Sequence, residues 1–134
     1  MKSEVDYFAS KKTEYVEVAD ANFGILKRDL ELVKYIRQKY EDTGYPQKIS
    51  ATWAKSSPDR LFEMSKILES MNRGGITLAL QSNNKTALDN IKRTNIANEK
   101  LSTISQRYAD AGMQTYHDFI IGLPGETLDS WKQG

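Results

Sequence analysis

The chain has 134 residues, with 19 basic and 18 acidic side chains, a net charge of +1 and no cysteine. The near balance of charge does not favour nucleic acid as a charge-driven partner. The lack of cysteine excludes a disulfide, a thiolate nucleophile or a cysteine-ligated iron–sulfur site built from these residues alone. No apolar run is long enough to span a membrane and no secretion signal opens the chain, so we expect a soluble cytoplasmic protein without a membrane partner.

Short β-rich segments alternate with amphipathic helical segments along the chain. After a helix in the first ten residues, we predict strands at 13–20, 48–55, 76–82 and 113–121, and helices at 28–42, 56–71, 84–92 and 98–111. The alternation is typical of a parallel sheet with right-handed crossovers. We therefore predict one α/β domain over 1–134 with four parallel strands in sequential order. An open doubly wound sheet and a segment of a (β/α) barrel both fit the pattern.

The helical segments have apolar residues at helical spacing, which predicts the faces they bury. For the segment near 28–42 these are Leu26, Leu30, Val33, Ile36 and Tyr40; for 56–71 they are Leu61, Met64, Ile67, Leu68 and Met71; for 98–111 they are Leu101, Ile104, Tyr108 and Ala111. Ser57 is the expected N-cap of the helix near 56–71, and Pro58 suits its first turn.

Polar residues follow the predicted strands at the point where each strand ends. The first strand ends at Asp20, with Asn22 beyond it; the other ends carry Lys55, the pair Gln81 and Ser82, and Gly122. Because the carboxyl ends of parallel strands meet at one rim, we expect these groups to converge. The alternatives are that Asp20 and Asn22 only hold a turn, that Lys55 is a solvated loop charge, and that Ser82 and Asn83 are plain helix N-caps.

The fourth predicted strand runs into Gly-Leu-Pro-Gly-Glu-Thr at 122–127. Glycine lets a backbone approach a flat ligand, and a helix starting near Glu126 would present unpaired N–H groups. This segment can therefore offer main-chain donors and acceptors to an adenine or an anion; the alternative is a tight strand-to-helix turn. His117 has no second imidazole or cysteine to join it in a metal site, so we expect a hydrogen-bonded structural histidine.

Four stretches taken together, "ADANFG", "TWAKSS", "ITLALQSNNKTALDNIKRTNI" and "IIGLPGETLDSW", resemble the radical S-adenosylmethionine (SAM) superfamily, most closely its cobalamin-binding-domain type. The resemblance covers most of the chain. It implies a partial (β/α)₆ barrel of the TIM-barrel kind, from the helix before the third barrel strand to the helix after the sixth. The family's CxxxCxxC cluster motif follows the first barrel strand, so the chain resembles a fragment of the catalytic barrel without that segment.

The resemblance also implies cofactors and site residues. SAM is the expected cofactor, and a 4Fe-4S cluster and possibly cobalamin are expected in the intact parent only. Many relatives carry Glu-Ser where this chain has Gln81 and Ser82, so hydrogen bonding to ribose is retained there and charge pairing with the SAM ammonium is not. No residue of this chain is predicted to be catalytic or to bind a metal. By resemblance, Gln81 and Ser82 meet the ribose and methionine parts of SAM, Arg93 meets its carboxylate, Gly122, Leu123, Pro124 and Gly125 lie against the adenine, and Asn22 and Lys55 face the same cavity.

The leading hypothesis is therefore the SAM-binding part of a radical SAM enzyme, inactive by itself. One alternative is a non-catalytic α/β protein that forms homo-oligomers through unpaired outer strands. Another is an unrelated nucleotide-binding module. The sequence gives that module little support, because it contains neither GxGxxG after a strand nor GxxxxGK[ST].

Overall fold

The computed structural model describes residues 1–54, 57–72, 75–78, 82–93 and 98–132, with the side chains of 98–100 left aside. Helices alternate with short strands, so the predicted α/β class is confirmed. The contacts divide the chain into two compact units, Met1–Ile76 and Thr77–Gly134, and each is described by itself. The expectation of one domain over 1–134 remains a prediction.

The first unit is built on a parallel pair of strands, β1 (Tyr15–Phe23) and β2 (Lys48–Trp53). Val16 pairs with Ile49 in the regular part of the ladder, and the register shifts between Val18 and Phe23. On the other edge of β2, Ile49 forms an isolated parallel β-bridge with Asn72. Both strands were predicted, although β1 runs further than expected and β2 ends before Ala54.

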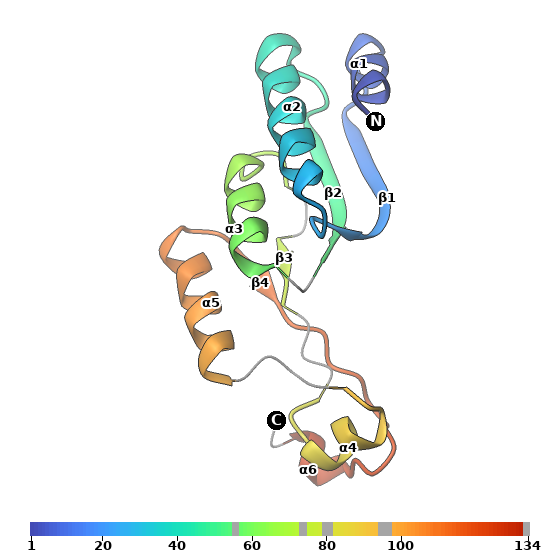
Figure 1. Cartoon of the computed structure of the whole chain (residues 1–134), viewed down its shortest axis with the longest axis vertical. Coiled ribbons are helices and arrows are strands. Elements are labelled where there is room, and N and C mark those ends of the chain that lie inside the picture. Colours follow the sequence, from blue (N-terminus) through green and yellow to red (C-terminus); the bar gives the residue numbers. More distant parts are fainter. Residues whose placement is uncertain (55–56, 73–74, 79–81, 94–97, 133–134) are drawn as a thin grey trace. The chain divides into compact units, whose positions relative to one another are not determined.

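Three helices accompany these strands: α1 (Lys2–Ser10), α2 (Lys27–Thr43) and α3 (Pro58–Ile67). Helix α2 packs against both α1 and α3, an arrangement that Figure 1 shows beside the β1–β2 pair. The side chains that this unit buries come from all three helices and both strands. They include Ala9, Phe23, Leu32, Val33, Ile36, Ile49, Trp53, Leu61, Met64, Leu68 and Met71.

The predicted buried faces of the helices are confirmed in part. In α3, Leu61 and Met64 are buried as predicted and Ile67 is half-buried. Leu68 and Met71 are also buried, but they lie beyond the helix, which ends at Ile67 and is shorter than the predicted 56–71. In α2, Val33 and Ile36 are buried as predicted, Leu30 and Tyr40 are half-buried, and Leu26 is 44% exposed. The reason is that α2 begins at Lys27, so Leu26 is its N-cap with extended backbone and lies off the helical face. Ser57 is the N-cap of α3 as predicted, although its side chain makes no capping hydrogen bond.

A buried carboxylate fixes the loop between β1 and α2. Asp29 is 4% exposed, and its Oδ2 accepts hydrogen bonds from the backbone N–H groups of Gly24 and Leu26, both at 3.0 Å. Gly24 has a φ of +98°, and a Cβ there would stand 2.6 Å from Leu61 Cδ2. Backbone with this φ is the left-handed region that favours glycine. Arg60 of α3 donates to the carbonyl oxygen of Ile25 at 2.7 Å, so both neighbouring helices hold this loop.

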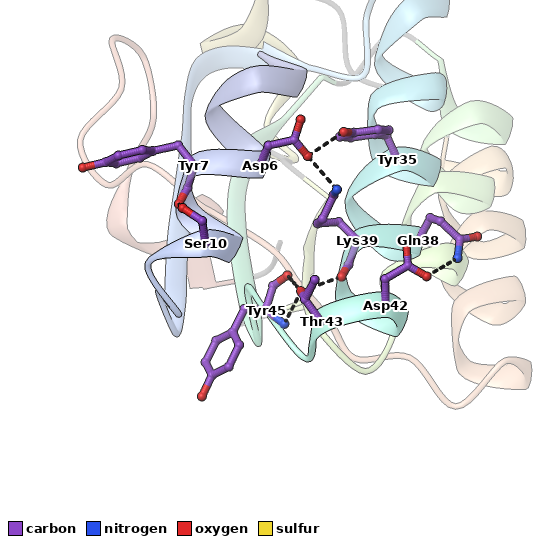
Figure 2. Close-up of polar contacts among 9 residues, drawn as sticks. All are labelled: Asp6, Tyr7, Ser10, Tyr35, Gln38, Lys39, Asp42, Thr43 and Tyr45. Atoms are coloured by element: carbon purple, nitrogen blue, oxygen red, sulfur yellow. Dashed lines mark hydrogen bonds and ion pairs between the residues drawn. The ribbon is translucent and has the colours of Figure 1, made fainter.

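Three polar side chains, which we call the α1–α2 cluster, join the first two helices: Asp6, Tyr35 and Lys39. Asp6 Oδ1 accepts from the Tyr35 hydroxyl at 2.6 Å and from Lys39 Nζ at 2.7 Å, as Figure 2 shows. The hydrogen bonds from Lys39 and then Tyr35 hold the pKa of the Asp6 carboxyl below its ordinary value of 3.8. The hydrogen bond with Asp6 raises the pKa of Tyr35 and that of Lys39. The cluster stabilises the contact of α1 with α2.

The second unit contains α4 (Lys85–Asn90), α5 (Asn98–Asp110), β4 (Thr115–Tyr116) and α6 (Leu128–Lys132), and β3 (Ile76–Thr77) leads into it. Strand β3 pairs with β4, and the N–H of Leu78 donates to the carbonyl oxygen of Tyr116 at 2.8 Å. Helix α5 packs on β4 and buries Tyr108, as predicted, whereas Leu101, Ile104 and Ala111 of the predicted face are half-buried.

Of the predicted strand 76–82, residues 79–81 lie outside the described residues, and only Ile76–Thr77 is strand in the rest; of the predicted strand 113–121, only Thr115–Tyr116 is strand. In the described residues each is two residues long, and the strands form two separate two-stranded sheets, β1–β2 and β3–β4. The four-stranded sequential sheet is therefore not shown. The apolar run after β4 has no strand partner among the described residues, and Phe119, Ile120 and Ile121 are 40%, 43% and 72% exposed. An apolar run indicates burial, but a strand also requires a neighbour that accepts its backbone hydrogen bonds.

Candidate functional site

The end of the third predicted strand carries a buried hydroxyl. Ser82 is 1% exposed; its hydroxyl donates to Glu126 Oε1 and accepts from the N–H of Asn84 at 3.0 Å. Asn84, rather than Ser82 or Asn83, is the N-cap of α4, and its Oδ1 accepts from the N–H of Ala87 at 3.1 Å. The alternative that Ser82 and Asn83 are plain N-caps is therefore wrong, because each precedes the capping residue.

The residues Gly122, Leu123, Pro124 and Gly125, which we call the glycine turn, follow the exposed apolar run. Gly122 and Gly125 have φ values of +82° and +83°, so both occupy the left-handed region. The N–H of Glu126 donates to the carbonyl oxygen of Leu123 at 3.0 Å and closes the turn. The tight turn that the sequence offered as one alternative is therefore present.

Helix α6 begins at Leu128, two residues after Glu126, and its first turn is capped locally. The N–H of Ser130 donates to the Thr127 hydroxyl at 3.1 Å, and the Ser130 hydroxyl accepts from the N–H of Thr127 at 3.0 Å. Because Thr127 supplies an acceptor for the helix start, the expectation of unpaired N–H groups there is wrong for Ser130. Ligand chemistry at the turn must use other main-chain groups.

The glycine turn and the end of the third predicted strand lie in contact within the second unit. Glu126 links the turn to Ser82, and Asn90 Nδ2 of α4 donates to the carbonyl oxygen of Pro124 at 2.9 Å. A Cβ on Gly125 would stand 2.6 Å from Asn90 Nδ2 and 3.3 Å from Thr86 Cγ2, so α4 and the turn approach closely. These contacts bring together Ser82 and the turn, which the sequence assigned to one site.

Arg93 follows α4, and its backbone N–H donates to the carbonyl oxygen of Leu88 at 2.9 Å. Its side chain is exposed and has no partner among the described residues. The guanidinium can therefore meet an anion without first breaking an ion pair in the described part of the chain.

The three remaining predicted site residues are Asn22, Lys55 and Gln81, and their roles stay predictions. Asn22 is exposed near the end of β1, and its N–H donates to Asp20 Oδ1 at 2.8 Å, a local contact of the kind that the turn alternative predicts. Asn22 belongs to the first unit, and its place beside a cofactor stays a prediction. Lys55 and Gln81 lie outside the described residues, so their predicted roles also stay predictions.

The only histidine in the sequence, His117, matches its predicted structural role. Its Nδ1 lies 2.7 Å from the carbonyl oxygen of Leu78, and because a carbonyl only accepts, Nδ1 carries the proton. The part of the chain that the structure describes contains no group of three histidine or acidic side chains suited to a metal ion. It also contains no helix that combines the length and the apolar character needed to cross a bilayer.

Sequence reasoning missed two side chains that organise these loops. The role of Asn90 could not be predicted from the sequence, because an asparagine at the end of a short helix is common and its partner, Pro124, is 34 residues away. Asp29 sits in a polar stretch where its burial could not be predicted. A hollow of about 440 Å³ between α1, α2 and β1, lined by Phe8, Val16, Val18 and Leu32 among others, was not predicted either.

No protein-family profile matches the chain. Two curated proteins match it along its whole length. One is the 2-(S-pantetheinyl)-carbapenam-3-carboxylate methyltransferase of Streptantibioticus cattleyicolor, 39% identical over 135 aligned positions, and the other is the cobalamin-dependent radical SAM methyltransferase TokK of Streptomyces tokunonensis, 36% identical over 135. The chain spans 20% of the length of each relative. It is thus a homologue of one segment of the cobalamin-dependent radical SAM methyltransferases, which confirms the family that its sequence motifs predict.

Proposed function

We propose that the chain is the SAM-facing part of the catalytic barrel of a cobalamin-dependent radical SAM methyltransferase. Both relatives are named methyltransferases, and the name of TokK adds that it is a cobalamin-dependent radical SAM enzyme. The chain corresponds to a fifth of their length, so the activity belongs to the proposal. The observation that carries it is the contact between Ser82 and the glycine turn through Glu126. In a barrel, the ends of successive strands form one rim, and cofactors bind there.

The strand pairing is compatible with the proposed barrel. Strand β1 pairs with β2, and β3 pairs with β4. Ile49 of β2 forms an isolated bridge with Asn72, which precedes β3 in the sequence. Every pair joins elements that are neighbours in the sequence. A barrel requires this order throughout, whereas a doubly wound sheet reverses its order at one point. The four strands would then be the third to the sixth of a (β/α)₆ barrel.

The glycine turn has the main-chain groups that an adenine needs. The carbonyl oxygens of Leu123 and Pro124 are occupied, whereas the N–H of Leu123 and the carbonyl of Gly122 bond to no described residue. A Cβ on Gly122 would meet no atom within 4 Å, so the space in front of it is open. A flat base with donor and acceptor edges can approach here. Arg93 offers a charged donor for the SAM carboxylate.

Ser82 has a more restricted part in this proposal. A hydroxyl has one proton, and that of Ser82 is donated to Glu126, so Ser82 is not a donor to SAM in this arrangement. The roles predicted for Gln81, Lys55 and Asn22 stay predictions.

The residues fit SAM but do not fit a 4Fe-4S cluster, because the sequence has no cysteine. Bound SAM supplies the radical and methyl chemistry of such enzymes, and this chain's part is to bind it and exclude water. We therefore propose that the chain alone is inactive and that cluster and cobalamin are held by other parts of the parent. Anaerobic reconstitution with iron and sulfide tests this: a stable four-iron species that cleaves SAM would contradict it.

Binding of SAM itself is tested by calorimetric titration of the chain with SAM, ATP and NAD. The proposal predicts binding of SAM in preference to the other two. Equal or stronger binding of ATP or NAD would favour the unrelated nucleotide-binding module.

Self-association is a second candidate, favoured by the exposed apolar run. Phe119, Ile120 and Ile121 are exposed, and one edge of β1 pairs with no described strand. Unpaired strand edges and apolar surface favour pairing with another chain. Sedimentation velocity over a range of concentrations tests it; a monomer throughout would contradict it.

A further inference from the structure

Asn90 holds the glycine turn against α4. Its Nδ2 donates to the carbonyl oxygen of Pro124 at 2.9 Å, and the missing side chain of Gly125 is what permits this approach. Helix α4 is itself fixed at its start by the Asn84 cap. The turn is thus attached to an element whose own position is set by a separate hydrogen bond.

Glu126 forms a second attachment on the other side of the turn. Its Oε1 accepts from the buried Ser82 hydroxyl, while its Oε2 is buried and has no partner among the described residues. A buried carboxylate oxygen without a donor costs free energy. The Ser82–Glu126 contact therefore fixes the geometry of the turn more than it stabilises the fold.

We propose, on the basis of the proposed SAM site, that Asn90 and Glu126 are positioning residues for the glycine turn. They orient the main-chain groups of Gly122 and Leu123 toward the ligand without contacting it. Asn90 acts as a donor and Glu126 as an acceptor, so the two make different demands on a replacement. Glutamine at 126 keeps an oxygen that accepts from Ser82, whereas aspartate at 90 keeps the size of asparagine but cannot donate.

The test compares five variants with the unsubstituted chain by calorimetric titration with SAM, adenosine and inosine: Asn90→Ala, Asn90→Asp, Glu126→Ala, Glu126→Gln and, as a matched control, Asp89→Ala. Asp89 is exposed on the same helix, and its side chain makes no hydrogen bond or ion pair with another described residue. Loss of either attachment is expected to weaken SAM binding roughly fivefold, the equivalent of one net hydrogen bond. Glu126→Gln and Asp89→Ala are expected to bind SAM as the unsubstituted chain does.

The ratio of the affinities for adenosine and inosine separates positioning from stability. These nucleosides differ in the hydrogen-bonding edge of the base, which a well-placed main chain distinguishes. The ratio is expected to move toward one in Asn90→Ala, Asn90→Asp and Glu126→Ala, even in samples that circular dichroism shows to be fully folded.

The outcomes for the inference and for the proposed function differ. If the unsubstituted chain binds SAM and the Asn90 and Glu126→Ala variants keep both its affinity and the nucleoside ratio, the inference is wrong and the SAM site stands. Loss of binding in Glu126→Gln equal to that in Glu126→Ala would also overturn the positioning role, because it would show a requirement for charge. If the unsubstituted chain binds neither SAM nor adenosine, both proposals fail.

Discussion

Substitution of Gly122 by alanine separates ligand contact from backbone strain, because the chain contains a matched glycine. Gly122 has a φ of +82° and Gly112 a φ of +71°, and a Cβ at either position meets nothing within 4 Å. Each alanine costs about 1–2 kcal/mol for the left-handed conformation. A gain of about 0.4–1 kcal/mol from the less flexible unfolded chain offsets part of that cost. Both variants are expected to lose similar stability, roughly 1 kcal/mol, in urea denaturation.

Binding of SAM should distinguish the two variants. The new methyl group at position 122 stands in the open space where we place the adenine, whereas position 112, at the end of α5, is not part of the proposed site. We expect Gly122→Ala to weaken SAM binding about tenfold, a change of about 1.4 kcal/mol. Gly112→Ala should leave the dissociation constant within error of the unsubstituted chain. Calorimetry supplies the affinities, and denaturation shows that both variants are folded.

One pattern would refute the reasoning. If the chain binds SAM and the two alanine variants bind it equally well, the glycine turn does not contact the ligand. Equal weakening in both variants would assign the effect to stability alone.

Three further predictions concern stability. Asp29→Ala removes the acceptor of two N–H groups, so we expect a loss of about 2–5 kcal/mol in urea denaturation; a loss below about 1 kcal/mol would contradict the assigned hydrogen bonds. Asp6→Asn should reduce the loss of unfolding free energy at acid pH. A carboxyl whose folded pKa lies below 3.8 stabilises the protein above that pH and loses this contribution as the pH falls through the folded pKa. Equal acid sensitivity of variant and parent would contradict this role of Asp6. Gly125→Ala should destabilise the chain less in an Asn90→Ala background than in the parent, because the Cβ would otherwise stand 2.6 Å from Asn90 Nδ2; strictly additive losses would show that the two residues do not interact.

The helices could be predicted closely because their burial follows a local period. Helix α3 buries Leu61 and Met64, and its C-cap residue Leu68 is also buried, as the spacing predicts. The start of α2 was less predictable, since the burial of Asp29 depends on N–H groups of a preceding loop. Local pattern therefore gave the helices and their inner faces but not the polar contacts that fix their ends.

The lengths of the last two strands could not be predicted from the sequence pattern. Apolar runs at 76–82 and 113–121 indicated buried strands, but β3 and β4 are two residues each. Strand length depends on partners that sit elsewhere in the sequence, and the exposed Ile121 marks the place where none is present in the described structure.

The turn at Gly122 and Gly125 could be predicted from the sequence, whereas its contacts could not. Gly122 and Gly125 predicted a turn, and both have positive φ. Nothing in the sequence indicated that Glu126 would bond to Ser82 or Asn90 to Pro124, because each pair is brought together only by the fold.

The most direct test of the SAM site is backbone amide chemical-shift mapping during titration of the chain with SAM. The account predicts that the largest shifts occur at Ser82, Arg93, Gly122, Leu123 and Gly125, with α1 and α2 unchanged. Shifts confined to the hollow beside α1, or shifts absent at saturating SAM, would contradict it.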